Sequence, residues 1–159
     1  MKQAIIWTLV VSAFFGVLLL AKPDKTQSEN GGGGKLTAAE TSYDFGAISM
    51  KAGNVKHAYI IKNTSDKPAV ITKAYTSCMC TEVSVGAGGQ QTGPFGMLGH
   101  GEIPDIEVEL EPGEEAQVVA EFDPAAHGSA GVGDIKRSVF VQPQSGPRME
   151  LTFKATVKP

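Results

Sequence analysis

The sequence predicts an all-β domain, a sandwich of seven or eight antiparallel strands, which follows an apolar N-terminal segment and a polar linker. Two observations carry this prediction. Beyond residue 35, apolar residues recur at every second position in short runs, which is the period of a half-buried strand. Clusters of Gly, Pro, Asn, Asp and Ser separate these runs, and no amphipathic helical pattern follows the N-terminal segment.

The first segment, residues 1–21, is predicted to be a signal anchor or a signal peptide. An uncharged run of 18 residues extends from Ala4 to Ala21. A bilayer is spanned by about 20 apolar residues, whereas a signal-peptide core has about 7–15, so an uncleaved transmembrane helix is favoured. Cleavage after Ala21 is the alternative, although Leu19 fits the small-residue pattern poorly. With Lys2 in the cytoplasm, the remainder faces the periplasm or cell exterior, and it is secreted if cleavage occurs.

Residues 22–35 are predicted to form a flexible linker, because they are polar and include four consecutive glycines. The globular domain is then residues 36–159. It contains ten Lys and Arg residues and fifteen Asp and Glu residues, which gives a net charge of −5. Nucleic-acid binding requires positive charge that neutralises phosphate, so this composition argues against a nucleic-acid partner.

Several runs within the domain are predicted to be strands from their alternating apolar residues. Phe122 and Phe153 each lie on the apolar face of such a run and are predicted to be in the core. Residues 86–104 interrupt the pattern with seven glycines and are predicted to be a long loop. The predicted strands are Val55–Lys62, Ala69–Thr76, Ala116–Phe122, Ile135–Gln142 and Met149–Val157, the last two joined as a hairpin.

Four segments of the domain read SYDFGAI (residues 42–48), KNTSDKPAVI (62–71), TSCMCT (76–81) and EPGEEAQVVAEFDP (111–124). Together they resemble the bacterial envelope family called domain of unknown function 1573, over nearly all of residues 36–159. The resemblance implies an exported, immunoglobulin-like β-sandwich related to modules of ciliary and centrosomal proteins, and it implies no activity. Many members of that family read Cys-Gly-Cys where this chain has Cys78-Met79-Cys80.

The two cysteines of the chain, Cys78 and Cys80, are separated by Met79 alone and are the first candidates for chemistry. On an extended strand, residues two apart project to the same side, so both sulfurs could bind one metal ion. A disulfide across one residue requires strained geometry, but an extracytoplasmic location favours oxidation, and a redox-labile disulfide is therefore the second interpretation. The third interpretation is a pair of small hydrophobic residues in the core.

Three further side chains are candidate ligands because they lie in glycine-rich loops, and the loops at the end of a sandwich can converge. Met97 and His100 lie in residues 86–104, and His127 lies in a later loop. With the cysteines they offer two thiolates, one thioether and two imidazoles. Soft sulfur donors favour Cu(I), whereas a site without the methionine would suit zinc. Each also has a structural interpretation, such as Met97 packing as a hydrophobic plug.

The sequence contains no catalytic motif that would make the protein an enzyme: it has no nucleophile elbow and no phosphate-binding loop with its lysine. We therefore expect a membrane-tethered extracytoplasmic domain that binds Cu(I), or zinc as the alternative, for metal handling or electron transfer. Its expected partner is a metal donor or acceptor protein or an envelope protein. The alternative is a non-catalytic immunoglobulin-like interaction module of the cell envelope, with a structural or redox-labile cysteine pair.

Overall fold

A computed structural model describes residues 34–159. The predicted signal anchor and nearly all of the predicted linker lie outside these residues. Within residues 34–159, no helix has the length and apolar character that crossing a bilayer requires.

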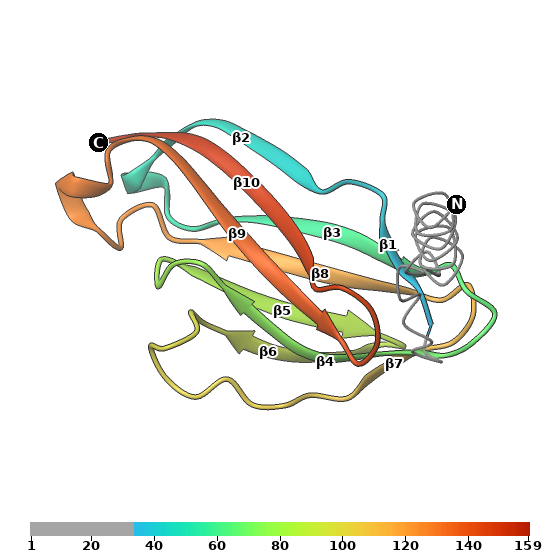
Figure 1. Cartoon of the computed structure of the whole chain (residues 1–159). Helices are drawn as coiled ribbons and strands as arrows, with labels where there is room; N and C mark the ends of the chain where they lie inside the picture. Colours follow the sequence, from blue (N-terminus) through green and yellow to red (C-terminus); the bar gives the residue numbers. More distant parts are fainter. Residues whose placement is uncertain (1–33) are drawn as a thin grey trace, which may run out of the picture. The chain divides into compact units, whose positions relative to one another are not determined.

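The described residues form two five-stranded β-sheets that pack against each other (Figure 1). The first sheet has the order β1 (Leu36–Ala38), β3 (Val55–Asn63), β8 (Glu115–Phe122), β5 (Thr81–Ala87) and β6 (Gln90–Phe95). The second has the order β2 (Ser42–Ser49), β10 (Met149–Lys158), β9 (Gly133–Pro143), β4 (Ala69–Thr76) and β7 (Val108–Leu110). Two short 3-10 helices accompany them, η1 (Met50–Ala52) and η2 (Gly128–Gly131).

The all-β sandwich is confirmed, with two differences in detail. The described residues contain ten strands rather than seven or eight, because β1 and β7 have only three residues each and are too short to show an alternating pattern. The strand pairs are antiparallel except β2 and β10, which run parallel. Parallel pairing gives no signal in a local sequence pattern, because it joins segments that are distant in the chain.

The predicted loop over residues 86–104 is wrong in its first part, where β5 and β6 form a hairpin. Gly88 and Gly89 make its turn with positive φ angles of 58° and 80°. A two-residue hairpin turn of type I′ requires this left-handed conformation at both positions, and glycine adopts it without strain. The glycine content of residues 86–104 predicted a loop, but two of these glycines, Gly88 and Gly89, form the turn of the hairpin.

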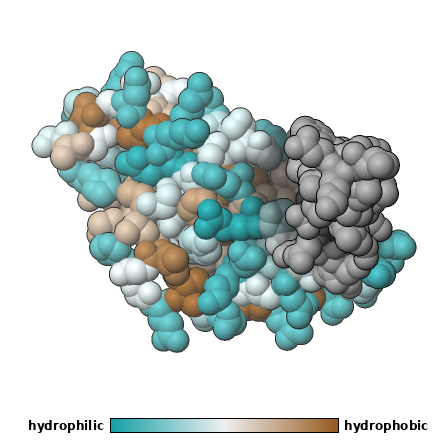
Figure 2. Space-filling model, in the orientation of Figure 1, coloured by the Kyte–Doolittle hydropathy of each residue, from teal (hydrophilic) through white to brown (hydrophobic). Residues whose placement is uncertain are grey.

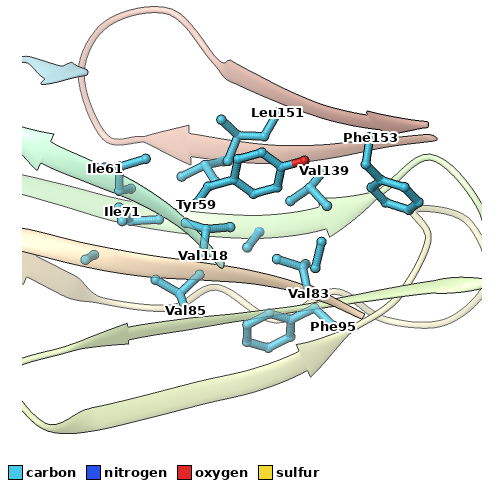
Figure 3. Packing of buried hydrophobic residues seen from close by; sticks show 14 of the residues in the cluster. Tyr59, Ile61, Ile71, Val83, Val85, Phe95, Val118, Val139, Leu151 and Phe153 are labelled. Atoms are coloured by element: carbon cyan, nitrogen blue, oxygen red, sulfur yellow. The ribbon is translucent and has the colours of Figure 1, made fainter. Parts of the chain in front are cut away.

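The core lies between the two sheets and is built from inward-facing residues of both (Figure 3). Phe122 of β8 and Phe153 of β10 are 3% and 1% exposed, and their ring centroids lie 5.5 Å apart. The predicted phase of both strands is therefore confirmed. Tyr59 of β3 is also fully buried, and its hydroxyl crosses the sandwich to donate a hydrogen bond to the Thr152 carbonyl at 2.7 Å.

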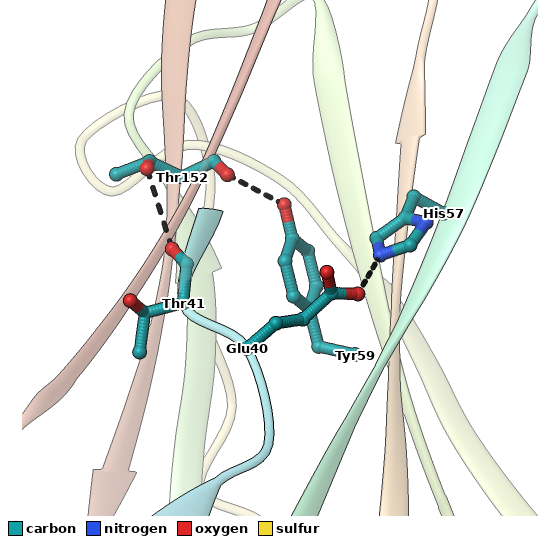
Figure 4. A network of polar contacts seen from close by, with 5 residues as sticks. All are labelled: Glu40, Thr41, His57, Tyr59 and Thr152. Carbon is teal, nitrogen blue, oxygen red and sulfur yellow. Dashed lines mark hydrogen bonds and ion pairs between the residues drawn. The ribbon is translucent and has the colours of Figure 1, made fainter. Parts of the chain in front are cut away.

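A polar network ties the start of β2 to both sheets (Figure 4). Glu40 pairs with the ring of His57 on β3, and the Thr152 hydroxyl donates to the Thr41 carbonyl at 3.3 Å. The His57 ring also stacks on Tyr43, with 3.6 Å between ring centroids. His57 is thus part of the packing between β2 and β3, and its ring partners are aromatic and carboxylate side chains.

Three connections meet at one end of the sandwich, on the left in Figure 1: residues 77–80 between β4 and β5, residues 123–132 between β8 and β9, and the first part of residues 96–107, which then run along the sandwich to β7. Hydrogen bonds join the first to its neighbours. The Thr76 N–H donates to the Gly96 carbonyl at 3.0 Å, and the Asp123 N–H donates to the Cys80 carbonyl at 2.9 Å. Segments that are far apart in the sequence therefore meet around the cysteine pair.

Candidate metal centre

Cys78 and Cys80 lie in a tight turn rather than in the extended conformation for which the sequence argument placed both sulfurs on one side. The chain leaves β4 in one sheet and enters β5 in the other within four residues, so it must reverse direction there. The Thr81 N–H closes the turn by donating to the Cys78 carbonyl at 3.1 Å. The buried Thr76 hydroxyl lies 3.0 Å from the Cys78 carbonyl oxygen and 2.9 Å from that of Thr81. These contacts hold the cysteine backbone in one conformation.

The turn brings both sulfurs next to His127. The Sγ atoms of Cys78 and Cys80 and a ring nitrogen of His127 all lie within 4.8 Å of one another, and we call them the three-donor group. The Cys78 Sγ lies 3.3 Å from the His127 Nε2. Ligands bound to one ion at about 2.0–2.3 Å are separated by roughly 3.5–4 Å, so the group can bind a metal ion with small adjustments.

Residues 123–132 position His127 through short backbone contacts. The Asp123 carboxylate accepts a hydrogen bond from the Ala125 N–H at 2.8 Å, and the Gly128 N–H donates to the Ala125 carbonyl at 2.9 Å. At Gly131, a Cβ atom would lie 3.2 Å from the His127 Cβ, closer than ordinary packing permits. The glycine therefore leaves the space that the histidine occupies.

Sequence reasoning missed a fourth residue at this site, Arg137 of β9. Its Nε–H donates a hydrogen bond to the Cys80 Sγ at 3.3 Å, and its Nη1 donates to the Lys136 carbonyl at 2.9 Å. The sequence does contain a signal for this residue, because Arg137 alternates in phase with Val139 and Val141, which are fully buried. A cation at an inward-facing strand position needs a partner, and here the partner is a sulfur.

The surroundings shift the pKa values of the two thiols in opposite directions. Burial raises the pKa of the Cys78 thiol, but hydrogen bonds from Cys80 and His127 and the charge of Arg137 outweigh it, and the pKa falls to about 7. Burial and the hydrogen bond with Cys78 raise the pKa of the Cys80 thiol. Cys78 is therefore the cysteine that carries the thiolate near neutral pH.

Met97 and His100 lie in the adjacent connection, residues 96–107. Met97 is half-buried, and its backbone forms a parallel β-bridge with Thr76, two residues before Cys78 in the chain. His100 is exposed and lies outside the three-donor group, and its N–H donates to the Met97 carbonyl at 3.1 Å. The structure thus brings His127 to the cysteines, while metal binding by Met97 and His100 stays a prediction.

The large hydrophobic residues that are exposed within residues 34–159 lie in the same three connections. They are Met79, Leu98 and Val132, with exposed fractions of 63%, 59% and 43%. Figure 2 shows hydrophobic residues at this end of the molecule, set among hydrophilic ones. The end of the sandwich that carries the three-donor group therefore also exposes apolar surface.

The family comparison agrees with the resemblance seen in the sequence. Residues 36–94 match the model of the family described as "Protein of unknown function (DUF1573)", and the Cys-x-Cys motif lies within the matched part. No curated protein matches the chain.

Solved structures share the fold. A protein of unknown function from Porphyromonas gingivalis W83 is 16% identical with a TM-score of 0.58, covering 77% of this chain and 46% of that one. A family 123 glycoside hydrolase from Clostridium perfringens is 8% identical with a TM-score of 0.51, covering 74% and 23%. The ASH/PapD-like domain 7 of human CEP192 is 14% identical with a TM-score of 0.46, covering 79% and 87%. The first two show the sandwich fold alone, and this chain spans less than half of each.

Proposed function

We propose, from the match of residues 36–94 to the DUF1573 family and from the three-donor group, that this protein is a membrane-tethered extracytoplasmic domain that binds Cu(I). It serves metal handling or electron transfer and is not an enzyme. The observation that carries the proposal is the placement of two sulfurs and one imidazole nitrogen within 4.8 Å of one another, from segments 49 positions apart.

The donor set supports Cu(I) over zinc. Two thiolates are soft donors, and a Cu(I) ion accepts three ligands in a trigonal arrangement. Zinc held by two cysteines and one histidine takes a water as its fourth ligand, whereas structural zinc sites almost always have four protein ligands, so zinc is the alternative metal. The half-buried Met97 is a candidate for a further soft donor, because its backbone pairs with Thr76 beside the cysteine turn.

The location and the partner are part of the proposal. The 18-residue uncharged run at Ala4–Ala21 supports a membrane anchor, and the glycine-rich residues 22–35 support a flexible tether. His127 is exposed and Cys78 is partly exposed, so another protein can reach a metal bound there. A metal donor or acceptor protein is the proposed partner, and it would contact the exposed Met79 and Leu98 beside the site.

A second candidate function is a non-catalytic interaction module of the cell envelope, with a redox-labile cysteine pair. The observation that favours it is the exposure of Met79, Leu98 and Val132 at one end of the sandwich, because exposed apolar residues are used for protein contacts. For this second function, the two sulfurs are close together because they form a reversible disulfide.

Metal titration separates the two functions. The purified full chain, reduced and kept in detergent without oxygen, is titrated with Cu(I) against a competing chelator. The Cu(I) proposal predicts one tightly bound ion per chain, which the Cys78→Ser/Cys80→Ser variant loses. A folded, reduced protein that binds Cu(I) and zinc no more tightly than its double-serine variant would rule out the metal function and leave the interaction module.

A further inference from the structure

Arg137 brings a full positive charge to the three-donor group. Its guanidinium Nε–H donates to the Cys80 sulfur at 3.3 Å, and the group lies on an inward-facing position of β9. The guanidinium group stays protonated at every pH at which the protein is folded. An arginine beside two metal-binding sulfurs is unexpected, because it repels the cation that those sulfurs attract.

No carboxylate cancels this charge within residues 34–159. The five ion pairs of the described chain are formed by other residues, and none includes Arg137. The remaining contact of the guanidinium, from Nη1 to the Lys136 carbonyl, is to a neutral acceptor. The sulfurs of the cysteine pair are therefore the anionic partners that Arg137 has.

We propose that Arg137 makes the site selective for monovalent soft metal ions over divalent ones; this inference rests on the proposed metal-binding function. When both sulfurs bind an ion as thiolates, they and the guanidinium together carry a charge of −1. A monovalent ion brings the total to zero. A divalent ion leaves a charge of +1, next to the Cys80 side chain, which is 3% exposed, and an uncompensated charge there is unfavourable.

The magnitude of the selectivity follows from Coulomb's law. One unit of charge at about 5 Å, in surroundings that are partly exposed to water, changes an affinity by roughly 10- to 100-fold. Removing Arg137 therefore strengthens the binding of both kinds of ion, but strengthens the binding of a divalent ion more. The loss of the hydrogen bond to Cys80 weakens both alike, so it cancels in the ratio of the two affinities.

The test compares Ag(I) with Cd(II), because both ions prefer thiolates and they differ in charge. Their affinities are measured by competition on the reduced full chain in detergent, for the parent and for Arg137→Met, Arg137→Gln and Arg137→Lys. Both neutral variants should shift the Cd(II)/Ag(I) affinity ratio toward Cd(II) by roughly 10- to 100-fold. Arg137→Lys keeps the charge and should change the ratio by less than about 3-fold. Cu(I) and Zn(II) should show the same trend.

The outcomes separate the two proposals. The selectivity inference is wrong if the Cd(II)/Ag(I) affinity ratio is unchanged in Arg137→Gln and Arg137→Met. It is also wrong if Arg137→Lys changes this ratio as much as the neutral variants do. Either result would show that Arg137 only holds Cys80 in place, and the metal-binding function would stand. A parent protein that binds neither ion would overturn the metal function and the inference with it. Thermal unfolding of each variant shows that the comparison is made on folded protein.

Discussion

The Nε2 atom of His127 lies 3.3 Å from the sulfur of Cys78, although the two residues are 49 positions apart in the chain. The contact exists because β5 and β8 are neighbours in one sheet, with Thr81 opposite Phe122. The turn before β5 and the connection after β8 are therefore side by side. The hydrogen bond from the Asp123 N–H to the Cys80 carbonyl fixes them to each other.

This contact predicts an unequal effect of the histidines on Cu(I) affinity. His127→Ala removes a member of the three-donor group and should weaken Cu(I) binding by at least about 10-fold. His100→Ala is the matched control, since it removes an exposed imidazole outside that group. Chelator competition on the reduced protein measures both. Equal losses in the two variants would show that His100 is a ligand as well, and an unaffected His127→Ala variant would exclude the three-donor group as the site.

A separate prediction concerns Met97, whose thioether is a candidate soft ligand that would favour Cu(I) over zinc. Met97→Leu keeps the bulk of the side chain and deletes its sulfur. If the thioether is a ligand, this change should weaken Cu(I) binding modestly, by roughly 3- to 10-fold, and leave zinc binding unaffected. Thermal unfolding of the metal-free parent and variant is the control, because a loss of packing would lower the stability of the variant even without metal. Equal Cu(I) affinities in parent and variant would restrict Met97 to a packing role.

The pKa of Cys78 predicts how its reactivity depends on pH in the metal-free protein. Since the pKa is lowered from 9.0 to about 7, the thiolate is present above about pH 7 and is lost as the pH falls through that value. The rate of alkylation of Cys78 by iodoacetamide should therefore rise with a midpoint near pH 7. Cys80, whose pKa is raised and which is 3% exposed, should react far more slowly.

His127→Ala supplies the control for this titration. The imidazole is one of the groups that lower the pKa of Cys78, so its removal should move the midpoint to higher pH. Peptide mass spectrometry assigns the alkylated cysteine at each pH. Preferential alkylation of Cys80, or a midpoint near the ordinary thiol value in the parent, would contradict the arrangement of hydrogen bonds around Cys78.

Phe122 and Phe153 predict where the stability of the sandwich resides. Truncation of either residue to Ala should lower the free energy of unfolding by about 3–5 kcal/mol, because each ring is almost fully buried. Since the ring centroids lie 5.5 Å apart, the two substitutions should not be additive: the loss of unfolding free energy in the double variant should differ from the sum of the two single losses. Met79→Ala, at a residue that is 63% exposed, should change stability by less than about 0.5 kcal/mol. Urea unfolding measures the free energy of unfolding of these four variants. Similar losses in Phe122→Ala and Met79→Ala would show that Phe122 is not part of the core.

The N-terminal boundary of the domain can be tested by truncation. Removal of residues 1–33 should leave the melting temperature almost unchanged, because residues 22–33 are polar and glycine-rich. Removal of residues 1–35 should lower it, since Gly34 donates to the Pro68 carbonyl at 2.9 Å and the Lys35 carbonyl accepts from the Thr64 N–H at 2.8 Å. A large loss in the shorter truncation would show that earlier residues pack on the domain.

The sequence by itself determined which residues face the core. The strand Ala69–Thr76 was predicted at its observed bounds from its place between a turn-rich cluster and the cysteines, and period-two alternation gave the correct phase of Phe122 and Phe153. These features are local, because side chains alternate across any extended strand whatever its partner. The cysteine pair was also recognisable as a candidate site, since its rarity and spacing are properties of the sequence alone.

Only the tertiary structure decided which residues join the cysteines. His100 and His127 both lie in glycine-rich loops, and the sequence of neither loop shows which imidazole reaches the cysteines. His127 is next to Cys78 because β5 pairs with β8, and Arg137 reaches Cys80 because β9 pairs with β4, where Thr76 lies opposite Val139. Strand pairing joins segments that are distant in the sequence, and it is decided by the packing of the whole sandwich rather than by any single run of residues.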